Sequence, residues 1–129
     1  MEDAQTAALL AQFVAAWESA DAARLVTLLA EGAVLTMPPM PTWYVGRNAI
    51  QHFLASFLFE NDAADRFRLI ATRANSAPAF AVYQRDNGGI YHAVAIQVLT
   101  VRHGQIMQID DFIGGSEGVF ARFGLAIVL

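Results

Sequence analysis

Apolar residues in the first third of the chain recur with the period of an α-helix. In residues 4–19 they stand three and four positions apart among alanines, which favour helix. This stripe consists of Leu9, Leu10, Phe13, Val14 and Trp17. A second apolar group begins after Asp21, which suits a helix N-cap, and runs to Gly32, which suits a helix end. That group consists of Leu25, Val26, Leu28 and Leu29. The pattern predicts two helices and then a short strand over residues 33–36.

Three of the four prolines lie in the stretch Thr36-Met37-Pro38-Pro39-Met40-Pro41-Thr42-Trp43-Tyr44-Val45-Gly46. Proline fixes its own backbone angle and keeps the preceding residue out of the helical region, so residues 37–41 are expected to be extended and rigid. A stiff loop of methionines and aromatic residues suits the rim of an apolar pocket. The alternative is that these side chains plug the end of a core.

Helical spacing returns after Gly46 and predicts a third helix to about residue 59, after which the pattern becomes that of strands. The strands are expected over residues 67–75, 79–85, 90–102 and 105–113. Their links are short and rich in turn formers, which favours antiparallel hairpins. We therefore expect one α+β domain over residues 1–129, with an antiparallel sheet curling around the first helices. The apolar tail, residues 120–129, should pack on this body or on a partner.

Composition narrows the possible partners. The chain has 129 residues, 56% of them hydrophobic, and a mean hydropathy of +0.39. No apolar run approaches the roughly 18 to 20 residues that span a bilayer, so we expect no membrane insertion. The net charge is −4 and the eight basic residues are scattered, which argues against direct nucleic-acid contact. The acidic start lacks the features of a signal peptide, which indicates a cytoplasmic protein. Three histidines without ligand spacing and no cysteine argue against a metal site.

Several short segments resemble a known superfamily. The order of elements, Ala16-Trp17-Glu18 with Asp21, and the closing Gly104-Gln105-Ile106 resemble nuclear transport factor 2-like proteins, and among them SnoaL-like domains. Three longer segments resemble the C-terminal accessory domain of extracytoplasmic-function RNA polymerase sigma factors. They are Leu35-Thr36-Met37-Pro38-Pro39-Met40-Pro41-Thr42-Trp43-Tyr44, Ile96-Gln97-Val98-Leu99-Thr100 and Phe120-Ala121-Arg122-Phe123-Gly124-Leu125. The sigma regions that bind promoter DNA and polymerase are not in this sequence, so it is either an excised domain or a free-standing relative.

The resemblance implies a cone-shaped α+β barrel whose open end binds small, largely apolar molecules, and it implies homodimers formed through the exposed sheet face. Enzymes of the superfamily resemble ketosteroid isomerases, polyketide cyclases and epoxide hydrolases, and they mostly work without a cofactor. They rely on an inward carboxylate with a shifted pKa and on donors that hold a developing oxyanion. Candidate ligand contacts are Trp17, Met37, Trp43, Tyr44, Phe53, Phe57, Tyr83 and Gln97.

Asp110 and Asp111 are adjacent on the last expected strand, so they must face opposite sides of the sheet. Asp111 shares its parity with Met107, Ile109 and Ile113 on an otherwise apolar face, and it matches an aspartate that SnoaL-like final strands often carry before an aromatic residue. Asp111 is thus the first candidate for a general base or a ligand-orienting acceptor. The alternative is that Asp111 is the partner of a buried arginine such as Arg73.

The strand over residues 90–102 leaves two possibilities for its polar residues. If its even positions face the core, His92 is a candidate acid or base near neutral pH. If the odd positions face inward, Gln97 is the polar pocket group and His92 is solvated. Tyr83 and Asn75 are further candidate donors to a ligand carbonyl, although both residue types are common at surfaces and turns.

Two functional hypotheses follow from the resemblance. The first is a regulatory domain that binds a small apolar ligand and packs on sigma factor regions or RNA polymerase. The second is a free-standing, cofactor-free isomerase, cyclase or hydrolase that uses Asp111 as its base. An oligomerising scaffold is a third, simpler possibility.

Overall fold

The computed structural model describes residues 4–59, 64–74 and 76–129. Its helical segments are α1 (Ala4–Glu18), α2 (Ala22–Val26), α3 (Arg47–Phe53), the π-helical turn η1 (Leu54–Leu58) and α4 (Glu117–Arg122). Its strands are β1 (Leu29–Met37), β2 (Met40–Val45), β3 (Phe67–Ala74), β4 (Ala77–Arg85), β5 (Tyr91–Arg102) and β6 (Gln105–Ile113). None of the helices in these ranges is long and apolar enough to cross a bilayer.

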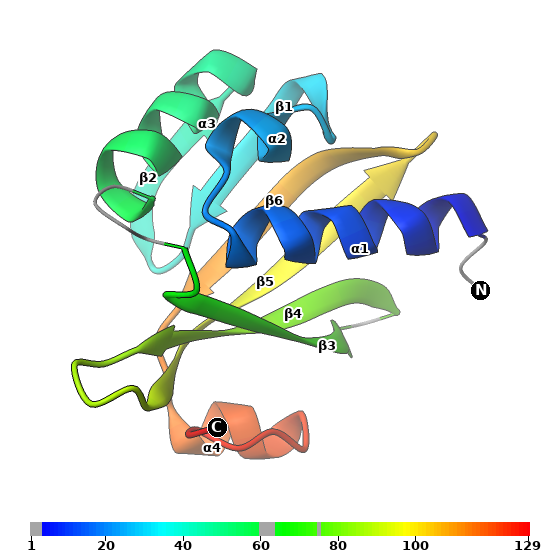
Figure 1. Ribbon diagram of the computed structural model, residues 1–129. Helices are drawn as coiled ribbons and strands as arrows, with labels where there is room; N and C mark the ends of the chain where they lie inside the picture. Colours follow the sequence, from blue (N-terminus) through cyan, green and yellow to red (C-terminus); the bar gives the residue numbers. More distant parts are fainter. Residues whose placement is uncertain (1–3, 60–63, 75) are drawn as a thin grey trace.

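The six strands form one curved sheet in the order β2-β1-β6-β5-β4-β3. Neighbouring strands are antiparallel except β1 and β6, which run parallel, so the sheet is mixed where the short links had suggested only hairpins. Figure 1 shows α1, α2 and α3 gathered on one side of this sheet and α4 on the other. We call the side that carries α1 the inner face and the side that carries α4 the outer face. The arrangement confirms the expected α+β fold with helices held against a curved sheet.

The second helix is shorter than its apolar pattern predicted. Asp21 caps α2 as expected, accepting a hydrogen bond from the backbone N–H of Arg24 at 3.0 Å, but the helix ends at Val26. Strand β1 begins at Leu29, and Gly32 lies inside that strand and does not end the helix. The prediction was wrong here because buried leucines at positions 28 and 29 fit a longer helix as well as the start of a strand. Apolar spacing alone does not distinguish these two structures.

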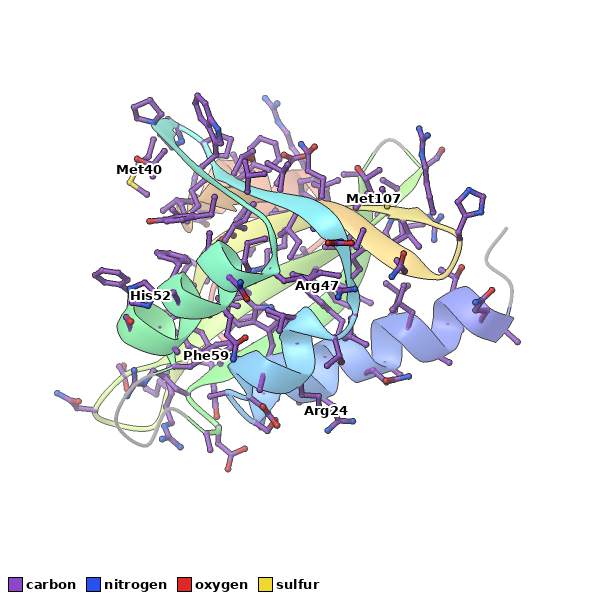
Figure 2. All side chains as sticks on the ribbon, turned by 90° about the horizontal axis from the view of Figure 1, so that it is seen from above. Arg24, Met40, Arg47, His52, Phe59 and Met107 are labelled. Carbon is purple, nitrogen blue, oxygen red and sulfur yellow. The ribbon has the colours of Figure 1, made fainter. Side chains whose placement is uncertain are left out.

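The proline stretch is a β-hairpin and not a free loop. Strand β2 pairs antiparallel with β1, and the turn between them contains Pro38 and a cis peptide bond to Pro39. Met40 lies at the tip of the hairpin (Figure 2) and is exposed. The extended backbone expected for residues 37–41 is therefore used in strand pairing on either side of the turn.

The remaining elements follow the predicted order with small shifts. The third helix, α3, ends at Phe53, and the π-helical turn η1 follows it directly up to Leu58. The strands begin and end within two residues of the predicted bounds, and Asn75 lies outside the described residues.

Both faces of the sheet are covered by apolar side chains, each with its own core. The inner core joins the helices to β1, β3, β4, β5 and β6. The smaller outer core consists of Ala81, Tyr83, Ile96 and Phe120, with α4 as its roof. The hydroxyl group of Tyr83 donates to the backbone carbonyl of Ala126 at 2.6 Å, which ties the tail to the sheet. The sequence predicted that residues 120–129 would pack on the body of the protein or on a partner, and in the structure they pack on the body.

Candidate functional site

Two polar side chains lie side by side on the inner face and are almost completely buried. Gln97 on β5 is paired in register with Asp111 on β6, and their exposed fractions are 0% and 6%. Phe80 on β4 is the partner of Gln97 on its other side. Met37 completes this row, because the preceding Thr36 is paired with the residue before Asp111. The odd positions of β5 from Ala95 onward therefore face the inner core, and the pair Gln97–Asp111 is its polar centre.

Several atoms of this interior lack a hydrogen-bond partner among the described residues. They are Nε2 and Oε1 of Gln97, Oδ1 of Asp111 and Nε1 of Trp17. Buried polar groups in folded proteins are nearly always paired, and leaving one unpaired costs about 1–3 kcal/mol. The three atoms of Gln97 and Asp111 belong to paired residues on one face, which is typical of a site that meets a polar atom from outside the chain.

The carboxyl group of Asp111 also has an unusual pKa. Burial among apolar side chains raises its pKa to about 7, and the nearby amide of Gln97, which does not form a well-aligned hydrogen bond to it, lowers the pKa in part. The group therefore changes between a neutral donor and a charged acceptor near neutral pH. A carboxyl group with this property can orient a ligand hydroxyl or carbonyl, or can remove a proton from carbon.

Aromatic rings pack within the inner core, on the same side of the sheet as this polar centre. Phe13 of α1 stacks on Phe80 with ring centroids 5.4 Å apart, which brings α1 over the row that contains Gln97. Trp17 packs edge-on against Phe59 and Phe67, at 4.9 and 5.4 Å. Figure 2 shows Phe59 between the helices on this side of the sheet. The interior is therefore largely apolar, and Trp17 is part of its core with one unpaired N–H.

A second group of rings forms the edge of the interior, where α3 meets β2. Tyr44 stacks on Phe53 at 4.5 Å, and Phe53 lies 5.6 Å from Phe57. Phe57 is 66% exposed, whereas the other two rings are half-buried. We call these three residues the aromatic rim, and they separate the inner core from solvent.

Histidine 92 lies outside the interior. Its ring is half-exposed at the start of β5, where Nε2 contacts Oδ2 of Asp86 at 2.7 Å. The hydrogen bonds from Ile90, Gly88 and His92 hold the pKa of Asp86 below its usual value. Of the two possibilities for β5, the structure has the one in which Gln97 is inward and His92 is solvated.

Two other candidate ligand contacts do not face the inner core. Tyr83 is fully buried, but it belongs to the outer core and stacks edge-on with Phe120 at 5.9 Å. Trp43 is 63% exposed and is paired with Thr36, whose neighbour in β1 is the inward Met37. Neither residue can therefore act together with Asp111 in this arrangement.

The surroundings of Asp111 on β6 differ from the expected ones in two ways. Met107 was expected to share the inner face with Asp111, yet it is 38% exposed because the pairing of β5 and β6 shifts by one residue between Thr100 and Val101. Arg73, the alternative partner of Asp111, lies on β3, three strands away from β6, and donates to the carbonyl of Ser76. The burial of Asp111 is therefore not explained by an ion pair with Arg73.

The open grooves of the protein lie elsewhere on its surface. One of them, about 800 Å³, runs between α1 and strands β3 and β4. A second, about 560 Å³, lies on the outer face beside α4. Neither is lined by Gln97 or Asp111, although the first is lined by Phe80, the neighbour of Gln97 on β4. Sequence patterns gave no signal for the outer groove, because it forms only when α4 folds back on the sheet.

In the described part of the chain, no three His, Cys, Asp or Glu side chains come together in a way that could hold a metal ion. The polar side chains of the inner site are the carboxyl group of Asp111 and the amide of Gln97, in a largely apolar interior.

Comparison with known proteins identifies both a relative and the fold. The chain is 33% identical over 117 residues to the ECF RNA polymerase sigma factor SigG of Mycobacterium tuberculosis, and the match covers 91% of this chain but 30% of the relative. The chain thus spans less than a third of the length of that protein.

Solved structures share the fold at low sequence identity. A candidate ketosteroid isomerase from Kribbella flavida is similar with a TM-score of 0.65 and 21% identity, covering 85% of this chain and 78% of the other. An NTF-2 like protein of unknown function from Burkholderia xenovorans has a TM-score of 0.68 and 11% identity, with 92% of each chain covered. The SnoaL-like domain model matches residues 10–109, which is most of the sequence. The chain is a member of the SnoaL-like domain family.

Proposed function

We propose that this chain is a ligand-binding regulatory domain whose inner face holds a small, largely apolar molecule through one hydroxyl or carbonyl group. The observation that carries the proposal is the buried pair Gln97–Asp111, in which three side-chain atoms have no hydrogen-bond partner among the described residues. A ligand oxygen placed between them would accept from the amide and would meet the carboxyl group as donor or acceptor.

The ionisation of Asp111 suits this role. With its pKa raised to about 7, the carboxyl group is present in both forms at neutral pH. The neutral form can donate to a carbonyl oxygen and the charged form can accept from a hydroxyl. Binding therefore has to depend on pH in opposite ways for these two ligand types.

The size of the ligand follows from the packing around the pair. Phe13 and Phe80 stack over the row that contains Gln97, so there is little room for a large body. The aromatic rim of Tyr44, Phe53 and Phe57 reaches solvent at the edge where α3 meets β2, and its outermost ring is mostly exposed. We therefore expect a ligand of about one ring that enters by displacing the rim.

The regulatory part of the proposal is supported by the similarity to SigG. A ligand that moves the rim would change the surface formed by α3 and β2, and so the way this domain packs on sigma factor regions or on RNA polymerase. Direct contact with nucleic acid is not part of the proposal, because the chain carries a net charge of −4.

A pair of probes that differ by one hydroxyl group tests the binding site. We expect p-cresol to bind at least about tenfold more tightly than toluene, because only p-cresol satisfies the buried polar pair. Gln97→Met, which keeps the shape and removes the hydrogen-bonding atoms, should abolish that preference, whereas Gln12→Met on the exposed side of α1 should keep it. Affinities can be measured by NMR titration. Equal binding of the two probes to the unmodified protein would contradict the proposal.

One observation favours a second function, catalysis of proton transfer. A buried carboxylate with a pKa of about 7 beside an amide donor could remove a proton from carbon next to a carbonyl and stabilise the enolate oxygen. Exchange of the α-protons of cyclohexanone in D₂O, followed by proton NMR, tests this. The rate should rise with pH to a plateau above 7 and should vanish in Asp111→Asn. A rate equal to that of buffer alone would exclude the catalytic function while leaving the binding test unaffected.

A further inference from the structure

The outer face carries a groove that is independent of the inner site and has its own charged group. Its floor is formed by Ile96 and Val98 of β5 and Phe112 of β6. Its wall is formed by Val119 of α4 and by Phe123, which directly follows that helix. The volume of about 560 Å³ is within the range of pockets that hold small organic molecules. Among the described residues that line it, Asp110 is the single ionisable side chain.

Asp110 is held in a fixed orientation. Its Oδ1 accepts from the hydroxyl group of Thr36 and from the side-chain amide of Gln108, both at 2.8 Å. These two donors occupy one oxygen, and no hydrogen bond from a described residue is found at Oδ2. The carboxylate is therefore preorganised by the sheet, with one oxygen left for a group in the groove.

We propose that this groove binds a small organic cation, an amine carried on an aromatic or branched aliphatic body. The apolar floor and wall would bury the body, and the free oxygen of Asp110 would accept a charge-assisted hydrogen bond from the ammonium group. Charge complementarity selects this class of ligand: an anion would meet a like charge, and no arginine or histidine in the described ranges lines the groove to offset it.

The position of Asp110 makes the site distinct from the inner one. Asp110 and Asp111 are consecutive on β6 and point to opposite faces, so the two carboxyl groups serve two enclosures separated by the thickness of the sheet. The outer site is lined by the even positions of β5, whereas Gln97 faces inward. Binding at the outer site does not require the proposed ligand of the inner face.

Three probes of the same shape and different charge test the proposal. We expect 4-phenylbutylamine to bind at pH 7 about tenfold more tightly than 4-phenylbutanol, and 4-phenylbutyric acid to bind most weakly. In ¹H–¹⁵N NMR titrations, the amine should shift the amide signals of Val98, Phe112 and Val119. Tighter or equal binding of the acid would overturn the assignment, as would shifts centred on Gln97 and Asp111.

Two variants and a control distinguish the contribution of the Asp110 charge to binding from the contribution of the apolar groove. Asp110→Asn keeps an acceptor for Thr36 and should reduce the affinity for the amine to that for the alcohol. Glu31→Gln removes one exposed negative charge elsewhere and should leave the amine affinity unchanged. Val119→Trp fills the groove from the exposed side of α4 and should abolish binding of all three probes. An amine affinity in Asp110→Asn equal to that in Glu31→Gln, or amine binding that persists in Val119→Trp, would overturn the proposal. So would a dimer that covers this face and excludes the amine.

Discussion

Replacing Asp111 by asparagine removes the ionisation of the buried carboxyl group while almost preserving its shape. In the folded protein the pKa of Asp111 is about 7, against an ordinary value of 3.8. Because the folded state holds the proton more tightly than the unfolded state, this group contributes stability that is complete below pH 3.8 and is lost as the pH rises through 7. The asparagine variant lacks this loss.

The size of the effect follows from the difference between the two pKa values. At about 1.36 kcal/mol per pKa unit, the full difference is worth about 4 kcal/mol. Between pH 5 and pH 8 the loss is about 2.7 kcal/mol, which for a chain of this size is a fall in Tm of roughly 10 °C. Relative to the unmodified protein, Asp111→Asn should therefore gain about 2.7 kcal/mol of unfolding free energy between these two pH values.

Urea denaturation at pH 5, 6, 7 and 8 measures this difference. Comparison of the two proteins at each pH cancels the titration of every other group, and Glu31→Gln, an exposed acid on β1, serves as the control that should show no such trend. A constant difference between Asp111→Asn and the unmodified protein across the range would refute the reasoning, because it would mean that Asp111 has an ordinary pKa.

Three further substitutions test the fold that positions the site. Tyr83→Phe removes the 2.6 Å hydrogen bond to the carbonyl of Ala126 and should cost about 1 kcal/mol, with faster amide hydrogen exchange confined to the C-terminal tail. Asp21→Ala removes the N-cap of α2 and should cost about 1 kcal/mol in urea denaturation, whereas Asp21→Asn should cost little. Gly115→Ala places a methyl group against the backbone carbonyl of Ala93 and should cost about 2 kcal/mol or more, measured as a lower Tm; an unchanged Tm would mean that the chain after β6 does not pack on β5 as described.

Much of the fold could be predicted from apolar periodicity. The stripe that contains Phe13 and Trp17 fixed the position of α1, and turn-forming residues fixed the ends of the last four strands. The end of α2 could not be found in the same way, because Leu28 and Leu29 are buried whether the chain is helical or extended there. The choice depends on the parallel pairing of β1 with β6, a contact between distant parts of the chain.

The inner site could be predicted only in part. Parity separated Asp110 from Asp111, and the structure has the second of them buried. Alternation could not decide between His92 and Gln97, because both faces of β5 are apolar and a one-residue shift in its pairing with β4 places Ala93 and Ile96 together in the outer core. The exposure of Met107 depends on a one-residue shift in strand pairing that no local pattern indicates.

The carboxyl ¹³C signal of Asp111, followed by NMR across pH 4–9 with and without p-cresol, tests the proposed site most directly. We expect a midpoint near 7 in the free protein, and a signal that moves when p-cresol is added, because the hydroxyl group of the probe would bond to the carboxyl group. A midpoint near 4, together with a signal that p-cresol leaves unchanged, would contradict the claim that the buried pair Gln97–Asp111 is a ligand site.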